Sequence, residues 1–106
     1  MYLYTRRLLL TSAAGADWAT RICEAGTKVG GVEINVWGSV WGPGYGAVTW
    51  TAWHADLPSL ESWGDTLNAD AGFQGVIAEG AELVEGGVDD GLLQVVAGDP
   101  DPAAND

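Results

Sequence analysis

Two stretches in which apolar and polar side chains strictly alternate constrain the fold of this chain more than any other feature. The first covers 32–41, and its apolar face carries Val32, Ile34, Val36 and Val40. The second covers 47–54, and one of its faces carries Val48, Trp50, Ala52 and His54. Successive side chains of a β-strand point to opposite faces, so both stretches predict strands. The Gly/Pro-rich segment 42–46 between them predicts a long hairpin.

The residues before this hairpin predict one strand and one helix. Residues 2–10 are aromatic and aliphatic and too few for an isolated helix, which favours a strand. Thr11-Ser12 can cap a following helix, and Gly30-Gly31 can end it. The apolar stripe of this helix is formed by Trp18, Ile22, Ala25 and Val29.

The residues after the hairpin predict a second helix and a last strand. Asp56 can cap this helix, and Pro58 is tolerated in its first turn. We expect a break at Gly72, a further helical piece that reaches past Leu83, and a stop at Gly86-Gly87 and 89–91. The last strand is then 92–97. Residues 1–97 form a single domain in this interpretation, and 98–106 form an acidic disordered tail.

The order β-α-β-β-α-β predicts an α+β fold of the ferredoxin-like type, a four-stranded antiparallel sheet with two helices on one face. The face with Val32, Ile34 and Val36 should lie under the helices. The opposite face carries Trp37, Trp41 and Trp53, part of a total of six tryptophans in 106 residues. A bare apolar face of this kind usually marks an interface, so we expect a two-fold homodimer.

Charge and composition exclude several classes of partner. The chain has 4 Lys+Arg against 15 Asp+Glu, a net charge of −11, which disfavours nucleic acid and anionic membranes. No segment has the length and hydropathy of a membrane span. Cys23 is the single cysteine, so it has no disulfide partner within the chain, and we predict that it is inert. These features favour a cytoplasmic protein, and the scarcity of lysine beside abundant Gly, Ala and Asp favours a high-GC bacterium.

Several short segments carry a resemblance to a known group. They are WGSVWGP at 37–43, VTWTAW at 48–53 and LPSLESW at 57–63, followed by NADAGF at 68–73. Together they resemble the dimeric α/β-barrel superfamily, in particular its NIPSNAP-like and antibiotic-biosynthesis-monooxygenase-like members. In those proteins an Asp-Pro segment before an aromatic residue splits the second helix, and Ala71 stands here in the place of the proline. The opening strand lacks the early acidic residue of the NIPSNAP-like pattern. The resemblance implies a homodimer that forms an α/β barrel.

The candidate ligand-binding residues all lie on the bare face of the sheet. The aromatic rings of Trp37, Trp41 and Trp53 suit a flat apolar or aromatic ligand, and an interface core is the alternative. Two polar side chains on this face, Glu33 and Asn35, can contact the same ligand or pair across the dimer. Either Arg6 or Arg7 can neutralise Glu33, since only one of the two can face inward.

Three functional hypotheses follow. The first is a homodimer of uncharacterised role that binds a small apolar or aromatic ligand in a Trp-lined cavity, without cofactor or metal. The second is a cofactor-independent monooxygenase acting on an aromatic polycyclic metabolite, with Glu33 or His54 as candidate catalytic residues. The third is a haem-binding protein in which His54, the single histidine, is the ligand. The sequence carries no phosphate loop, zinc signature or nucleophile elbow, so it leaves the question of an enzyme open.

Overall fold

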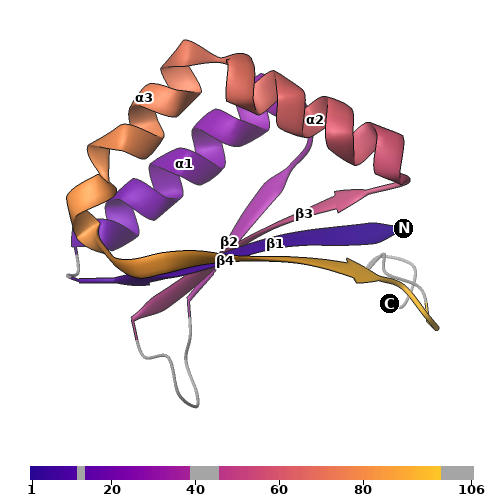
Figure 1. The fold of residues 1–106 in the computed structure, drawn as a ribbon, viewed down its shortest axis with the longest axis horizontal. Coiled ribbons are helices and arrows are strands. Elements are labelled where there is room, and N and C mark those ends of the chain that lie inside the picture. The colour runs from indigo at the N-terminus through magenta and orange to yellow at the C-terminus, as the bar shows by residue number, and fades with distance from the viewer. Residues whose placement is uncertain (12–13, 39–45, 99–106) are drawn as a thin grey trace.

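The computed structural model describes residues 1–11, 14–38 and 46–98. Within these ranges the chain forms four strands, three α-helices and one short 3-10 helix (Figure 1). In chain order they are β1 (Tyr2–Leu10), α1 (Ala14–Gly30), β2 (Ile34–Gly38), β3 (Ala47–His54), α2 (Leu57–Ala69), α3 (Ala71–Glu79), η1 (Ala81–Leu83) and β4 (Val84–Gln94). The predicted α+β ferredoxin-like order is therefore confirmed.

The four strands form one antiparallel sheet in the order β2-β3-β1-β4. β1 lies at the centre and pairs with β3 on one side and with β4 on the other, while β2 and β4 are the edges. In the register, Arg6 is opposite Trp50 on β3 and opposite Asp90 on β4. The first and last strands of the chain thus lie side by side.

All three α-helices cover the same face of the sheet, and no helix of the described residues covers the other face, which we call the bare face (Figure 1). The core lies between the two layers. Its buried members from the sheet are Leu8, Ile34, Val48, Trp50 and Ala52, and those from the helices are Trp18, Ala19, Ile22, Leu67 and Phe73. The predicted division of β2 and β3 into a helix-side face and an opposite face is confirmed, because Ile34, Trp50 and His54 are buried while Trp37 and Trp53 are exposed.

Helix α1 buries the predicted stripe and ends as predicted. Trp18 and Ile22 are buried, and Ala25 and Val29 pack at the margin of the core. Asp17 lies in the first turn and Lys28 in the last, which suits the helix dipole. Gly31 has a φ of 72°, and its N–H donates to the carbonyl of Thr27 at 3.1 Å. Glycine adopts this left-handed conformation without strain, so the helix stops there.

The break in the second helical region lies at Asp70, not at Gly72 as predicted. Asp70 has an extended backbone and closes α2 through its N–H, which donates to the carbonyl of Leu67 at 3.3 Å. Its side chain accepts a hydrogen bond from the N–H of Phe73 at 2.8 Å and so caps α3. One aspartate therefore ends one helix and starts the next, and Gly72 follows inside the first turn of α3.

The largest error of the sequence-based prediction concerns β4. We expected helix up to Gly86-Gly87 and a strand over 92–97, but the strand covers Val84–Gln94 and includes 86–87 and 89–91. Glycine and aspartate are typical of turns, so the prediction placed a break in the chain at 86–87 and 89–91. They are accommodated here because β4 is an edge strand with a register irregularity opposite 7–9 and a left-handed Gly86.

Some expectations lie outside the described residues. These are the Ser12 half of the first helix cap, the end of the first alternating stretch with Val40 and Trp41, most of the loop 42–46, and the tail beyond Gly98. In the described ranges no helix is long and apolar enough to cross a membrane.

Gly80, between α3 and η1, gives a test of how tightly the helical layer is packed. A Cβ at this position would overlap the indole of Trp18, although the backbone φ of −99° accepts any residue. We expect Gly80→Ala to lower the free energy of unfolding by about 1–3 kcal/mol, measured by denaturant unfolding. The control is Gly75→Ala in α3, where a Cβ meets no atom within 4 Å and should be neutral or slightly stabilising. Equal effects of the two substitutions would contradict the close Trp18 contact.

Candidate functional site

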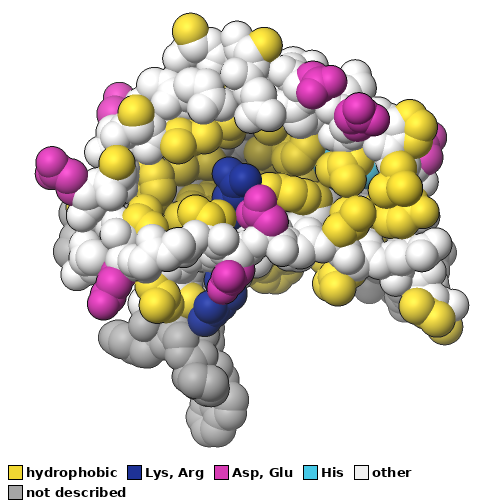
Figure 2. All heavy atoms as spheres, in the orientation of Figure 1, with side chains coloured by type: hydrophobic (Ala, Val, Ile, Leu, Met, Phe, Trp, Pro, Cys, Tyr) yellow, Lys and Arg dark blue, Asp and Glu magenta, His cyan; other side chains and the backbone are white. Residues whose placement is uncertain are grey.

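A pocket of about 630 Å³ lies between the sheet and its helices. β1 and β3 form its floor, α1, α2 and α3 form its roof, and β4 borders one side. Figure 2 shows this hollow with hydrophobic walls and, inside it, one basic side chain next to an acidic one. A volume of 300–1,000 Å³ is typical of sites for small organic molecules.

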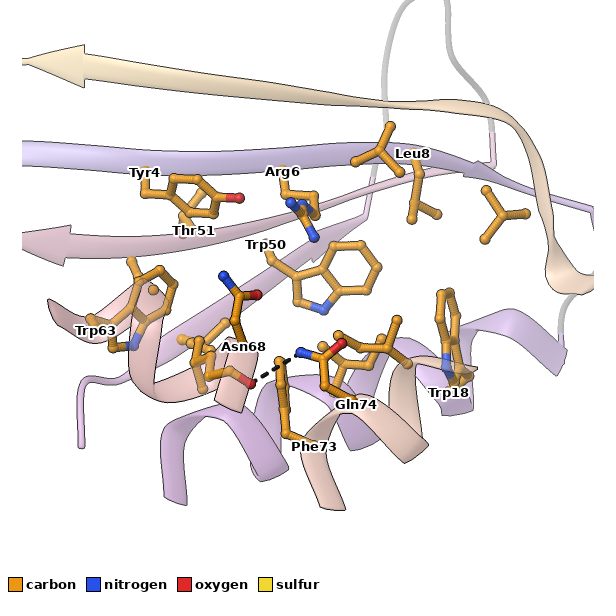
Figure 3. Close-up of a pocket in the computed structure, with 18 of the residues that line it drawn as sticks. Tyr4, Arg6, Leu8, Trp18, Trp50, Thr51, Trp63, Asn68, Phe73 and Gln74 are labelled. Atoms are coloured by element: carbon orange, nitrogen blue, oxygen red, sulfur yellow. Dashed lines mark hydrogen bonds between the residues drawn. The ribbon is translucent and has the colours of Figure 1, made fainter. Parts of the chain in front are cut away.

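The apolar walls are fixed by two tryptophans whose indole N–H groups are satisfied. Trp50 on β3 donates to the carbonyl of Ala19 at 3.0 Å, and Trp18 on α1 donates to the carbonyl of Val76 at 2.8 Å. The two rings meet edge to face with centroids 5.9 Å apart. Phe73 and Trp63 add further aromatic surface (Figure 3).

Arg6 lies in this apolar pocket and forms an ion pair with Asp90. Arg6 donates from Nε and Nη2 to the two carboxylate oxygens of Asp90, at 2.8 and 2.9 Å. Hydrogen bonding to Arg6 lowers the pKa of Asp90, and hydrogen bonding to Asp90 raises the pKa of Arg6. Both side chains keep over two fifths of their surface exposed, so the pair adds little to stability. Its position in the pocket suggests a role other than folding.

Tyr4 lies two residues before Arg6 and points its hydroxyl towards the guanidinium (Figure 3). Burial raises the pKa of this hydroxyl, Asp90 raises it further, and Arg6 opposes the shift. The phenol therefore stays protonated, and hydrogen bonding to Asp90 contributes to the shift, so Tyr4 belongs to the same polar group as Arg6 and Asp90. Its ring meets Trp63 edge to face at a centroid distance of 5.5 Å.

Two amides approach the pocket from the helical side. Gln74 of α3 donates from Nε2 to the carbonyl of Leu67 at 3.0 Å, which fixes the orientation of its side chain. Asn68, near the end of α2, lines the pocket and points towards the sheet (Figure 3). The pocket thus combines aromatic walls with a small number of polar groups that can orient a ligand.

The predicted ligand-binding residues lie elsewhere. Trp37 and Trp53 are on the bare face of the sheet, 59% and 38% exposed, and Trp37 donates from Nε1 to the hydroxyl of Thr51 at 2.7 Å. Glu33 and Asn35 are exposed and do not line the pocket, and Trp41 lies outside the described residues. The structure does not bring these side chains to the pocket, and their role in ligand binding stays a prediction.

The register shows that Arg6 and Arg7 occupy opposite faces of the sheet, while neutralisation of Glu33 by an arginine stays a prediction. Arg6 shares the helix-side face with Tyr4 and Leu8 and lines the pocket. Arg7 is opposite Thr49 and Asp89 and belongs to the bare face. The carboxylate that neutralises Arg6 is Asp90, on β4, and not Glu33.

His54 is buried under α2 as the alternation predicted. It is 3% exposed, its ring lies 4.6 Å from that of Trp63, and its Nε2 has no hydrogen-bond partner. It does not line the pocket, from which Trp63 separates it. Burial lowers the pKa of this imidazole, so the neutral form is favoured. These surroundings offer no open path to Nε2 for a haem iron or for a substrate.

No group suited to hold a metal ion occurs in the described part of the chain, where three or more His, Cys, Asp or Glu side chains nowhere converge. The thiol of Cys23 donates to the carbonyl of Ile34, and burial raises its pKa, with Glu24 and Glu33 adding to the shift. A thiol in this state is a poor nucleophile, in agreement with the prediction that Cys23 is inert.

The pocket residues that the sequence analysis missed are Tyr4, Arg6, Trp18, Trp63, Asn68, Phe73 and Gln74. It also missed Asp90, the partner of Arg6. A partial signal was present, since alternation assigned Trp50 to the helix side and helical spacing did the same for Trp18. Nothing in the local sequence pairs Arg6 with Asp90, because the two are 84 positions apart and Asp90 was placed in a turn.

Solved structures with the same fold come from several bacteria. An uncharacterised NIPSNAP domain protein of Burkholderia xenovorans matches with a TM-score of 0.76 and 17% identity, over 95% of this chain and 100% of that one. A NIPSNAP family protein of Agrobacterium tumefaciens matches with a TM-score of 0.75 and 14% identity, over 93% and 96%. The chain has the fold of a NIPSNAP domain. The predicted resemblance is thereby confirmed for the fold.

The oxygenase side of the resemblance is also confirmed at the level of fold. SnoaB, a cofactor-independent oxygenase from Streptomyces nogalater, matches with a TM-score of 0.66 and 13% identity, over 94% of this chain and 97% of that one. No protein-family model and no curated protein matches the chain. At these identities the likeness defines the fold and assigns no activity.

The buried His54 gives a pH dependence that can be assigned to one residue. Its pKa lies below the value of about 6.5 for an unfolded chain, so the unfolded state binds more protons as the pH falls below that value. We expect the free energy of unfolding of the wild type to fall as the pH is lowered from about 7 to 5. In His54→Phe the contribution of His54 to this decrease should be absent. Denaturant unfolding of both proteins at several pH values in this range measures the free energy of unfolding. Parallel profiles of the two proteins would contradict the burial of a neutral His54.

Proposed function

We propose that this protein binds a small apolar or aromatic ligand in the pocket between the sheet and its helices, and that it acts as a homodimer. Ligand binding is supported by one observation: the pocket of about 630 Å³ has aromatic walls and contains the polar side chains of Tyr4, Arg6 and Asn68. Burial of ring surface supplies the affinity, and a few polar groups supply the orientation.

Binding is favoured over catalysis by the chemistry of the pocket. Cofactor-free oxygenation of an electron-rich ring needs a group that removes a proton, and Asp90 is the carboxylate bonded to Arg6 of the pocket. Hydrogen bonding to Arg6 lowers its pKa, which makes it a weak base. His54, the other candidate base, is buried away from the pocket. Monooxygenation therefore stays the second candidate, supported by the fold shared with SnoaB.

The bare face of the sheet supports the homodimer. Trp53, Leu3 and Leu93 are opposite one another on three neighbouring strands and form a continuous apolar row. Trp53 and Leu93 are exposed in the single subunit, as is Trp37 further along the sheet. Exposed apolar surface of this kind is covered in most proteins, and a second copy placed sheet to sheet would cover it. Glu33 and Asn35, which are exposed in the single subunit, would then lie near this interface.

The remaining features of the proposal rest on composition. The net charge of −11 disfavours nucleic acid and anionic membranes as partners. A single cysteine suits a reducing compartment, and the structural neighbours with stated sources are bacterial. We retain a bacterial cytoplasm as the expected location.

Filling the pocket tests the ligand site. Gly64 of α2 lines the pocket, and a Cβ there would meet no atom within 4 Å. We expect ethylnaphthalene, an uncharged aromatic probe, to bind the wild type in calorimetry, and Gly64→Phe to weaken binding at least about tenfold by occupying the space. Gly75→Phe is the matched control, because Gly75 has the same free space but does not line the pocket. Absence of binding to the wild type, or equal losses in the two variants, would refute the site.

A charge placed on the apolar row tests the homodimer. We expect the wild type to be a dimer at micromolar concentration in size-exclusion chromatography with light scattering, and Leu93→Lys to shift it to monomer. Burying the unpaired ammonium group of this lysine at an interface costs free energy, so the substitution should weaken the dimer. Leu57→Lys is the control, since Leu57 is similarly exposed but lies on α2. A monomeric wild type would rule out the dimer.

A further inference from the structure

The Arg6–Asp90 pair leaves part of the guanidinium unused. Asp90 takes hydrogen bonds from Nε and Nη2, so its carboxylate occupies one side of the planar group. The remaining edge, which carries Nη1, is not engaged by Asp90. Arginine has five N–H donors in a rigid fork, and two of them serve this ion pair. The other three do not take part in the ion pair.

The side chain of Arg6 lines the pocket. Figure 3 shows the guanidinium between the hydroxyl of Tyr4 and the ring of Trp50, on the side of the sheet that faces the helices. All three residues line the pocket. The protonated hydroxyl of Tyr4 is hydrogen-bonded within this group, to Asp90, and so helps to hold the ion pair in place. Arg6 therefore presents N–H donors to one region of an otherwise apolar wall.

Charge decides which acceptor fits these donors. Arg6 is the sole Lys or Arg among the described residues that line the pocket, and Asp90 neutralises it. An anionic ligand would bring a second carboxylate beside that of Asp90, in a protein that already carries a net charge of −11. An uncharged oxygen gains the hydrogen bonds without this repulsion. A neutral acceptor is therefore favoured over an anion of the same size.

We infer that the ligand is an uncharged aromatic compound with a carbonyl oxygen, which accepts hydrogen bonds from the N–H groups of Arg6 that Asp90 does not engage. This inference rests on the proposed function, since it names the chemistry of the ligand in the same pocket. Asp90 acts in it as a positioning and selecting residue. It holds the guanidinium in place and prevents the pocket from selecting carboxylates.

Three probes with one ring system separate the contributions. Acetylnaphthalene carries a neutral carbonyl, ethylnaphthalene has no acceptor, and naphthoate carries a carboxylate. We expect acetylnaphthalene to bind the wild type about tenfold more tightly than ethylnaphthalene in calorimetry, the gain typical of hydrogen bonds to a charged donor. Naphthoate should bind more weakly than acetylnaphthalene by a similar factor.

Substitutions of the pair assign these preferences to residues. Arg6→Met should abolish the advantage of acetylnaphthalene over ethylnaphthalene, while Arg7→Met should leave it unchanged, because Arg7 is on the bare face of the same strand. Asp90→Asn retains the size of the side chain and removes its charge. It should raise the affinity for naphthoate at least about tenfold and reverse the order of the two acceptor probes. Thermal unfolding of each variant checks that the fold is retained.

The outcomes distinguish this inference from the proposed function. If none of the probes binds the wild type, the proposed function fails and the inference fails with it. If acetylnaphthalene and ethylnaphthalene bind equally, the ligand site stands and the carbonyl preference is refuted. If naphthoate binds the wild type more tightly than acetylnaphthalene, or if Asp90→Asn leaves the order unchanged, Asp90 does not select against anions and the inference is likewise overturned.

Discussion

The arrangement of sheet and helices depends on two buried indoles that each need a hydrogen-bond acceptor. Trp50 reaches from β3 to the carbonyl of Ala19 in α1, and Trp18 reaches from α1 to the carbonyl of Val76 in α3. An unsatisfied buried N–H costs roughly 1–3 kcal/mol, so each bond restricts the neighbouring element to one position. The two rings also contact each other edge to face, so β3, α1 and α3 are held as one unit. The pocket lies beside this unit, where the remaining helix, α2, covers the central strand.

The central strand explains why the polar site is at this position. β1 contributes Tyr4 and Arg6 to the helix-side face, and its two neighbours bring Trp50 and Asp90 into register with Arg6. A guanidinium in an apolar space needs a counter-charge, and the adjacent edge strand supplies it. Tyr4, Arg6 and Asp90 thus come from two strands that are distant in the sequence. Aromatic rings from the helices lie around them.

Periodicity was sufficient to predict the elements that alternate clearly. The faces of β2 and β3 and the stripe of α1 were predicted correctly, since one side of each meets the core. Periodicity shows which side chains share a face, but it does not show where packing leaves a space. Trp37 and Trp53 were therefore chosen for a pocket, whereas the space is bordered by Trp18, Trp50 and Trp63. β4 was missed over most of its length, because its alternation is interrupted by glycines and aspartates.

The unusual composition of β4 has a consequence for the behaviour of the chain in concentrated solution. As an edge strand, β4 leaves one row of backbone N–H and C=O groups without a neighbouring strand. Glu85 and Asp89 place negative charge along this strand, and the irregularity opposite Arg7–Leu9 interrupts its straight course. Two such edges repel each other and do not match in shape. Sheets of successive molecules are thereby prevented from joining through β4 into open-ended fibrils.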